Sequence, residues 1–182
     1  MSIRLFAAIA LPDHVVERLL PLMKGVPGAI WRPRENLHLT LRFFGEVSEP
    51  MADDIDAGLG AIGETTAPFE LRLKGAGAFG GADPHALYVG AAESEALKKL
   101  AAHCERAARR SGLKPETRKF AAHVTIAYLK SAPLDRVHAF ESRLGLFEAP
   151  PFRVESFGLY SSWVRKSAPS LYRLEAEYAL VG

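Results

Sequence analysis

Two tripeptides of the form His-x-Thr constrain this 182-residue chain more than any other feature of its sequence. In residues 37–43, leucines alternate with polar side chains, and His38 and Thr40 fall on the same side; such alternation is the period of a half-buried strand. A second apolar segment carries His123 and Thr125 at the same spacing. Each strand is therefore predicted to present one imidazole and one hydroxyl about 7 Å apart on one face.

The rest of the chain mixes strands with helices. Apolar periodicity and turn residues predict strands at residues 3–11, 37–43, 69–74, 86–90, 120–129, 152–160 and 171–180, and helices at 13–23, 50–62, 94–110 and 134–144. We expect Gly45 to end the second strand and a glycine-rich loop at 75–81 to join the third and fourth. The two histidine strands lie in similar surroundings. This favours an α+β fold of two sheet-bearing lobes that face each other, in a single domain over residues 1–182.

Composition excludes several classes of protein. With 48% hydrophobic residues, 24% charged residues and a net charge of +2, the chain has the character of an ordinary globular domain and not of a disordered one. It lacks the dense lysine and arginine runs of a protein that coats duplex nucleic acid, so any phosphate site is expected to be local. A single cysteine, Cys104, excludes an intrachain disulfide, and no apolar run reaches the roughly 20 residues of a membrane span. We expect a cytoplasmic monomer that does not bind membranes.

The paired His-x-Thr motifs suit hydrolysis of a phosphodiester. One imidazole can take a proton from water and the other can give one to the leaving oxygen, because an unperturbed histidine titrates near pH 6.5. The threonine hydroxyls would donate hydrogen bonds to the non-bridging phosphate oxygens. This scheme requires no cofactor and no metal, and neither tripeptide has a cysteine or carboxylate nearby on its face to complete a zinc site. The alternative is that both histidines are structural members of a sheet.

Residues 75–80 read Gly-Ala-Gly-Ala-Phe-Gly and match the dinucleotide-binding fingerprint literally. That fingerprint needs a helix immediately afterwards to receive the pyrophosphate. Here a further glycine, an aspartate and a proline lead into another strand instead. We interpret the segment as a hairpin loop.

Several segments together resemble a known family, the two-histidine phosphoesterases, and within it the RNA 2′,3′-cyclic phosphodiesterase branch, also called 2′-5′ RNA ligase-like proteins. The resemblance spans nearly the whole chain and rests on residues 4–9, 31–33, 35–47, 120–127 and 159–162, on Tyr172 and on the glycine-rich segment. It implies a fold of two pseudo-symmetric antiparallel-sheet lobes with outer helices and a central cleft. It also implies that His38 and His123 are the acid–base pair and that Thr40 and Thr125 bind phosphate. The implied reaction is the metal-independent opening of a 2′,3′-cyclic phosphate, on an RNA end or a small nucleotide, to a 2′-phosphomonoester.

The chain departs from the family pattern near the second histidine. Many relatives have proline at the position of Ala122 and arginine at the position of Tyr128. Loss of the guanidinium weakens phosphate binding, because a phenol cannot make its bidentate charged contact. Lys130 is a candidate substitute two residues further along, and Arg42, on the face of His38, is another candidate substrate contact; both also fit exposed surface positions.

Two further questions stay open from the sequence. Trp31, Phe44 and Trp163 are candidates for stacking an RNA base, with packing against the sheet as the alternative. The leading hypothesis is a cyclic phosphodiesterase. The alternatives are a nucleotide-binding module with little turnover, motivated by Tyr128, and a 2′-5′ RNA ligase.

Overall fold

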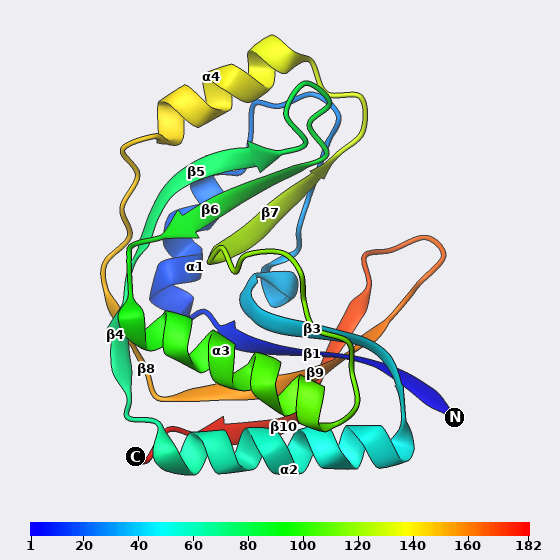
Figure 1. Cartoon of the computed structure of the whole chain (residues 1–182). Coiled ribbons are helices and arrows are strands. Elements are labelled where there is room, and N and C mark those ends of the chain that lie inside the picture. Colours follow the sequence, from blue (N-terminus) through cyan, green and yellow to red (C-terminus); the bar gives the residue numbers. More distant parts are fainter.

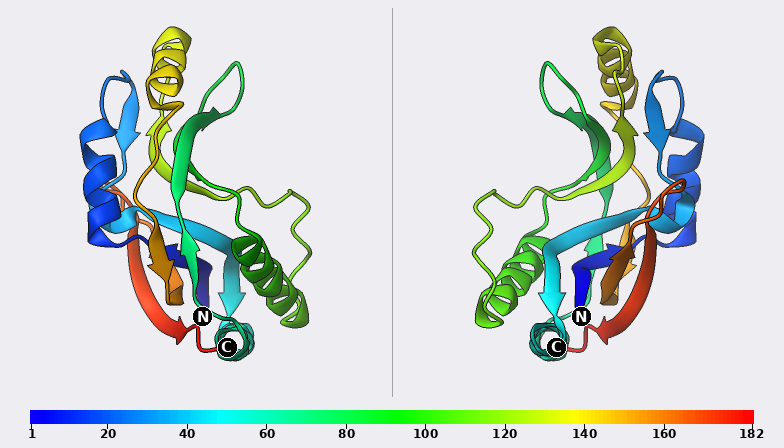
Figure 2. Two further views of the ribbon diagram at one scale, coloured as in Figure 1. Left: turned by 90° about the vertical axis from the view of Figure 1, so that its left-hand side faces the viewer. Right: turned by 90° about the vertical axis from the view of Figure 1, so that its right-hand side faces the viewer.

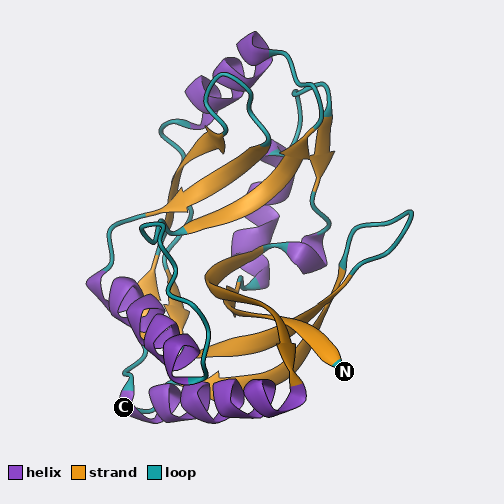
Figure 3. Cartoon of the chain, turned by 45° about the vertical axis from the view of Figure 1, so that its right-hand side comes forward, coloured by secondary structure: helices purple, strands orange, loops and turns teal.

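The computed structural model describes all 182 residues and shows a strongly bent antiparallel sheet with helices on its outer sides (Figure 1). The strands are β1 (Ser2–Ala10), β2 (Ala29–Trp31), β3 (His38–Ser48), β4 (Phe69–Leu71), β5 (Leu73–Phe79), β6 (Ala86–Ala91), β7 (His123–Leu129), β8 (Phe152–Val154), β9 (Ser156–Trp163) and β10 (Leu171–Ala179). The α-helices are α1 (Asp13–Leu19), α2 (Glu49–Thr65), α3 (Glu95–Arg110) and α4 (Leu134–Leu144), with short 3-10 helices at Leu20–Leu22 and Arg34–Asn36. The predicted α+β class is confirmed (Figure 3).

The main sheet joins two groups of strands. Its order is β10-β9-β1-β3-β7-β6-β5, and β2 pairs with β7 beside this path. Strands β1 and β3 pair along their whole length, whereas β3 and β7 share a single residue pair, Leu39 with Val124. The sheet therefore diverges into two lobes on either side of that pair (Figure 2). Strands β4 and β8, which lead from one lobe to the other, pair separately.

Each lobe has its own pair of helices. Helices α2 and α3 pack on each other and on the β10-β9-β1-β3 lobe. Helix α4 packs on β5, and its Arg143 guanidinium donates to the carbonyls of Leu22 and Lys24, just after α1. Ser94 caps α3, because its hydroxyl accepts a hydrogen bond from the Leu97 amide. None of these helices combines the length and apolar character that crossing a membrane requires.

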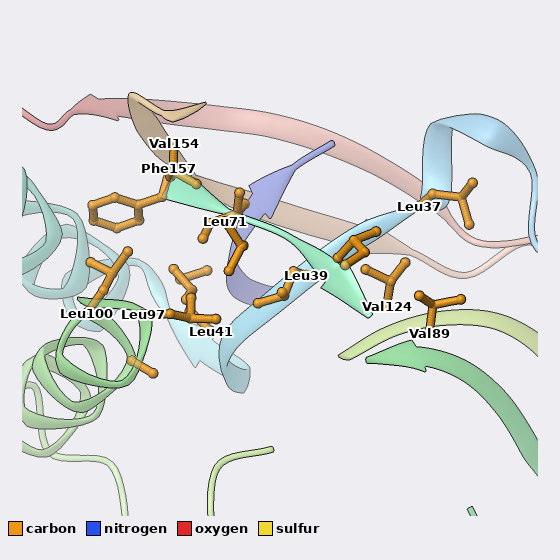
Figure 4. Packing of buried hydrophobic residues seen from close by; sticks show 14 of the residues in the cluster. Leu37, Leu39, Leu41, Leu71, Val89, Leu97, Leu100, Val124, Val154 and Phe157 are labelled. Carbon is orange, nitrogen blue, oxygen red and sulfur yellow. The ribbon is translucent and has the colours of Figure 1, made fainter. Parts of the chain in front are cut away.

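One apolar core runs through both lobes. A contiguous cluster of 38 buried residues includes side chains from every α-helix and from both histidine strands. Figure 4 shows Leu39 and Leu41 of β3 with Leu97 and Leu100 of α3 on one side and Val124 on the other. The alternating leucines of β3 thus supply the link between the two halves of the core.

Strand β3 is longer than predicted. The expectation that Gly45 ends the strand is wrong, because pairing with β1 continues as far as Ser48. Gly45 has a φ of +77°, and Phe44 is an extra residue opposite the junction of Leu5 and Phe6 in β1. The glycine therefore accommodates a β-bulge rather than a strand end.

The glycine-rich segment is also more regular than predicted. Gly75 and Gly77 belong to β5, so the loop between β5 and β6 begins only after Phe79. A Cβ atom at Gly77 would lie 2.5 Å from the Tyr88 hydroxyl oxygen, so the absent side chain makes room for that ring. Because β5 leads into β6 and not into a helix, the hairpin interpretation is confirmed and the dinucleotide fingerprint is excluded.

The remaining differences concern short elements. Residue patterning does not indicate β2, which has only three residues. Helix α1 ends at Leu19, and the following turn becomes a 3-10 helix that contains Pro21. Strand β7 begins at His123, three residues later than predicted.

Leu39 allows a test of how strongly the inter-lobe core stabilises the fold. Replacing this fully buried side chain by alanine should lower the free energy of unfolding by about 3 kcal/mol, through lost burial and the cavity left behind. Urea denaturation followed by circular dichroism measures the change. Leu146→Ala, at a side chain that is 98% exposed, is the control and should change stability by less than about 0.5 kcal/mol. Equal stability of the two variants would contradict this role of Leu39.

Candidate active site

The single pair between β3 and β7 brings the two His-x-Thr motifs together. Leu39 and Val124 are both fully buried on the core face of the sheet. Because the strands run antiparallel, their neighbours on the opposite face meet crosswise, with His38 facing Thr125 and Thr40 facing His123. Directly opposed side chains in such a pair have Cβ atoms about 5 Å apart. Two imidazoles and two hydroxyls thus form one partly exposed cluster related by approximate two-fold symmetry.

A β-bulge follows each motif at the same position. Leu41 is an extra residue between the paired positions of Thr40 and Arg42 in β3, and Ile126 is the extra residue directly after Thr125 in β7. Both bulged side chains are buried. Because each bulge sharpens the local strand twist, the two strands separate just beyond the motifs.

The bulge at Ile126 corrects one prediction. Strict alternation along the predicted strand at 120–129 places Ala127 on the face of His123 and Tyr128 on the opposite, apolar face. In the structure Ala127 is fully buried and the side chain of Tyr128 is 46% exposed. The extra residue reverses the alternation, so Tyr128 leaves the core face of the sheet.

The His38 ring is held in its neutral form. Burial lowers its pKa to about 4; the carbonyl of Asn36 opposes this shift, whereas the charges of Arg32 and His123 reinforce it. The Nε2 atom lies 3.1 Å from the Thr40 hydroxyl oxygen. Because a neutral ring that donates to a carbonyl through Nδ1 has Nε2 free as an acceptor, the Thr40 hydroxyl donates to it.

Aromatic side chains from the β1-β9-β10 end of the sheet enclose this ring. Phe6 stacks on His38 with centroids 4.8 Å apart, and Tyr172 approaches the imidazole edge-on at 5.3 Å. Phe6 also stacks on Tyr160 at 5.4 Å. This wall desolvates His38. The sequence does not predict these aromatic contacts, because strand alternation gives no information on which distant strand is the neighbour.

His123 is oriented by a different set of contacts. Its Nδ1 atom donates to the carbonyl oxygen of Ala121 at 2.7 Å, because a carbonyl can only accept. The Nε2 atom is thereby left for a reacting group. Phe79 and Tyr88 meet the ring edge-on at 4.9 and 5.8 Å. The lobe of β5 and β6 therefore supports the second histidine as β1 and β10 support the first.

The sequence matches a known protein family over most of its length. The family model described as the 2′-5′ RNA ligase superfamily matches residues 12–163. The chain belongs to this superfamily. The predicted resemblance is therefore confirmed.

Relatives within the superfamily cover most of the chain. An RNA 2′,3′-cyclic phosphodiesterase of Aeropyrum pernix is 34% identical over 78% of this chain and 83% of its own length. A protein of the same name from Archaeoglobus fulgidus is 32% identical over 84% and 89%. The fold matches a crystal structure of a Thermus thermophilus protein, with a TM-score of 0.82, 28% identity and 98% coverage of both chains. The predicted two-lobed fold is confirmed by this match.

The Arg42 side chain binds groups of the protein itself. Its guanidinium pairs with Glu105 of α3 and donates to the carbonyls of Phe43 and, at 3.0 Å, Lys114. These contacts serve the packing of α3 on β3, and the predicted substrate contact at Arg42 stays a prediction.

The other candidates have different surroundings. Tyr128 lies beneath the Arg32 guanidinium, whose Cζ is 4.9 Å from the ring centroid. Lys130 is exposed just beyond β7, and its backbone amide donates to the Gly28 carbonyl. Its predicted contact with substrate stays a prediction.

Of the aromatic residues considered for base stacking, two take part in packing. Phe44 is buried in the core, and Trp31 packs against Phe140 of α4. Trp163 is 46% exposed and lies beneath the Arg173 guanidinium, so it is available to a ligand but stands apart from the histidine cluster.

The two main cavities of the molecule do not include the histidine cluster. A cavity of about 260 Å³ lies beside β8 and β9, and one of about 550 Å³ lies between α2 and α3. The histidines and threonines line neither of them. No group of three or more histidine, cysteine or carboxylate side chains has the arrangement of a metal site.

Nuclear magnetic resonance can test the environment of His38. We expect its imidazole to remain neutral when the pH is lowered to 6 and to titrate with a pKa near 4, because burial and the Arg32 charge disfavour protonation. Histidine side-chain spectra between about pH 3 and 8 measure this titration, and His38→Asn assigns the signal. Titration of that signal near pH 6.5 would contradict the burial argument.

Proposed function

We propose that this protein hydrolyses a 2′,3′-cyclic phosphate, at the end of an RNA or on a small nucleotide, to a 2′-phosphomonoester. The observation that carries the proposal is the crosswise cluster of His38, Thr40, His123 and Thr125 about the Leu39–Val124 pair. In the proposed reaction the two imidazoles would act on opposite sides of one phosphorus atom. The names of the superfamily relatives support the same activity.

The two histidines receive different roles in this proposal. His38, neutral at pH 7, accepts a proton from water through Nε2 as the water oxygen attacks phosphorus. The bond from phosphorus to the 3′ oxygen breaks, and His123, acting as the acid, gives a proton to that oxygen through Nε2. The products are a 3′ hydroxyl and a 2′-phosphate, and a proton transfer between solvent and the two rings restores the enzyme.

The threonines position the phosphate between the histidines. Each hydroxyl lies two residues from one histidine and opposite the other, so both can donate to the non-bridging oxygens. Before substrate binds, the Thr40 hydroxyl is directed at His38. Substrate binding would turn this donor to the phosphate and free Nε2 of His38 for the attacking water.

A short RNA with a 2′,3′-cyclic phosphate end provides the direct test. The parent protein should convert it to the 2′-phosphate in the presence of a chelator. His38→Ala and His123→Ala should each lower kcat about 10²- to 10⁴-fold, because each removes one proton-transfer group. Chromatography against 2′- and 3′-phosphate standards measures rate and product together.

A matched variant controls for general damage to the protein. His103→Ala changes a histidine of α3 that lines the cavity between α2 and α3, and it should leave the rate within about twofold. Loss of activity on chelation, or full activity of His38→Ala, would contradict the proposal. Tight binding of the cyclic phosphate without turnover would support the nucleotide-binding module, and joining of RNA ends in place of hydrolysis would support the ligase.

The pH dependence of kcat/KM tests the assignment of His38 as the base. A base acts when it is neutral, so the rate should rise with pH through its pKa and level off above it. With that pKa near 4, the acidic limb should lie near pH 4 and not near 6.5. Circular dichroism at each pH confirms folding, since between pH 6.5 and 4 the unfolded chain binds more protons at this residue and stability falls. An acidic limb at pH 6.5 would contradict the assignment.

A further inference from the structure

The histidine cluster lacks a cation at the position where many relatives have arginine, because residue 128 is tyrosine. A guanidinium nevertheless lies over the Tyr128 ring, supplied by the residue that follows β2. Arg32 follows β2, which pairs with the end of β7, and its Cζ is 4.9 Å from the centre of the Tyr128 ring. Its position therefore depends on β2, the strand that the sequence did not reveal.

The backbone fixes Arg32 beside the second motif. Its amide donates to the carbonyl of Ile126 at 2.9 Å, and Trp31, the residue before it, pairs with Ala127. Ile126 is the bulged residue directly after Thr125. The same bulge that moves Tyr128 out of the core therefore also receives the backbone of Arg32.

The Arg32 charge reaches the first motif as well. It contributes to the lowered pKa of His38. Burial raises the pKa of Tyr172, the Tyr128 phenol adds to that rise, and the Arg32 guanidinium opposes it. Since the bulge moves Tyr128 off the core face and Arg32 Cζ lies 4.9 Å from its ring centroid, the guanidinium lies on the same side of the sheet as the histidine cluster.

Arg32 is also free of acidic partners. Arg34, two residues later, pairs with Asp13 at 2.9 Å, and Arg42 pairs with Glu105. Arg32 has no carboxylate oxygen within 4 Å, and its side chain is only partly exposed. A partly buried guanidinium that rests on an aromatic ring and has no counter-ion is well suited to bind an anion.

We propose that Arg32 binds the non-bridging oxygens of the substrate phosphate, in place of an arginine at position 128, and that Tyr128 is the platform that holds its guanidinium. This inference rests on the proposed function and adds a phosphate-binding residue to it. The positive charge comes from the residue that follows β2 instead of from a residue of β7. Tyr128 therefore does not mark a loss of the phosphate cation.

The proposal can be tested by moving the guanidinium from residue 32 to residue 128. Arg32→Ala should lower kcat/KM for 2′,3′-cyclic cytidine monophosphate about 10- to 100-fold, the usual effect of one charge-assisted hydrogen bond. Tyr128→Arg in the Arg32→Ala background should recover at least tenfold, because it returns a guanidinium to the same place from the neighbouring strand. Arg34→Ala removes a nearby exposed charge and should stay within about twofold.

Three results decide the matter, provided that circular dichroism shows each variant folded. Equal kcat/KM for Arg32→Ala and Arg34→Ala would overturn the proposal. If the double variant is no more active than Arg32→Ala, an arginine at position 128 does not bring its guanidinium to the place that Arg32 occupies. In calorimetric titration with inorganic phosphate, Arg32→Ala should bind at least tenfold more weakly than Arg34→Ala. Equal affinities of these two variants for phosphate would contradict the role of Arg32. If the parent protein does not hydrolyse cyclic phosphates, that result alone would refute the proposed function, and the phosphate titration would still test Arg32.

Discussion

The antiparallel pairing of Leu39 with Val124 is the constraint on which the candidate site depends. Both side chains are fully buried, and they form the only residue pair between β3 and β7. Every histidine and threonine of the cluster lies next to one member of this pair. A slip of one residue in either strand would move its imidazole and hydroxyl to the core face. Burial of two apolar side chains therefore determines the register of four polar ones.

Approximate symmetry brings the two motifs together, but the surroundings make the histidines different. His38 lies within a wall of Phe6 and Tyr172, and its pKa is lowered by that burial. His123 has Phe79 at its edge and a carbonyl on Nδ1. A reaction that needs one base and one acid cannot use two identical imidazoles in identical states. The different walls of the two lobes provide the distinction that the repeated motif lacks.

The sequence predicted the parts of the fold that depend on local periodicity. Helix α4 has the predicted bounds, and the alternation in β3 placed His38 and Thr40 correctly on the face opposite Leu39. Two of the failures share one cause: a bulge adds a residue only relative to a partner strand, and the sequence does not say which strand that is. Gly45 and Tyr128 were misplaced for this reason. The position of Arg32 was missed similarly, because it depends on the pairing of β2 with β7.

The contacts of Arg42 show how the first motif is connected to the second. The Glu105 carboxylate pairs with Arg42 and Arg109 and accepts a hydrogen bond from the Glu116 amide at 3.0 Å. Burial opposes its ionisation, but these donors together lower its pKa, so the carboxylate is charged. Glu116 belongs to the segment that runs from α3 to His123, whereas Arg42 lies two residues after Thr40. One carboxylate therefore ties the strand of the first motif to the segment that delivers the second. Arg42 and Glu105 thereby help to hold the two halves of the cluster in a fixed relative position.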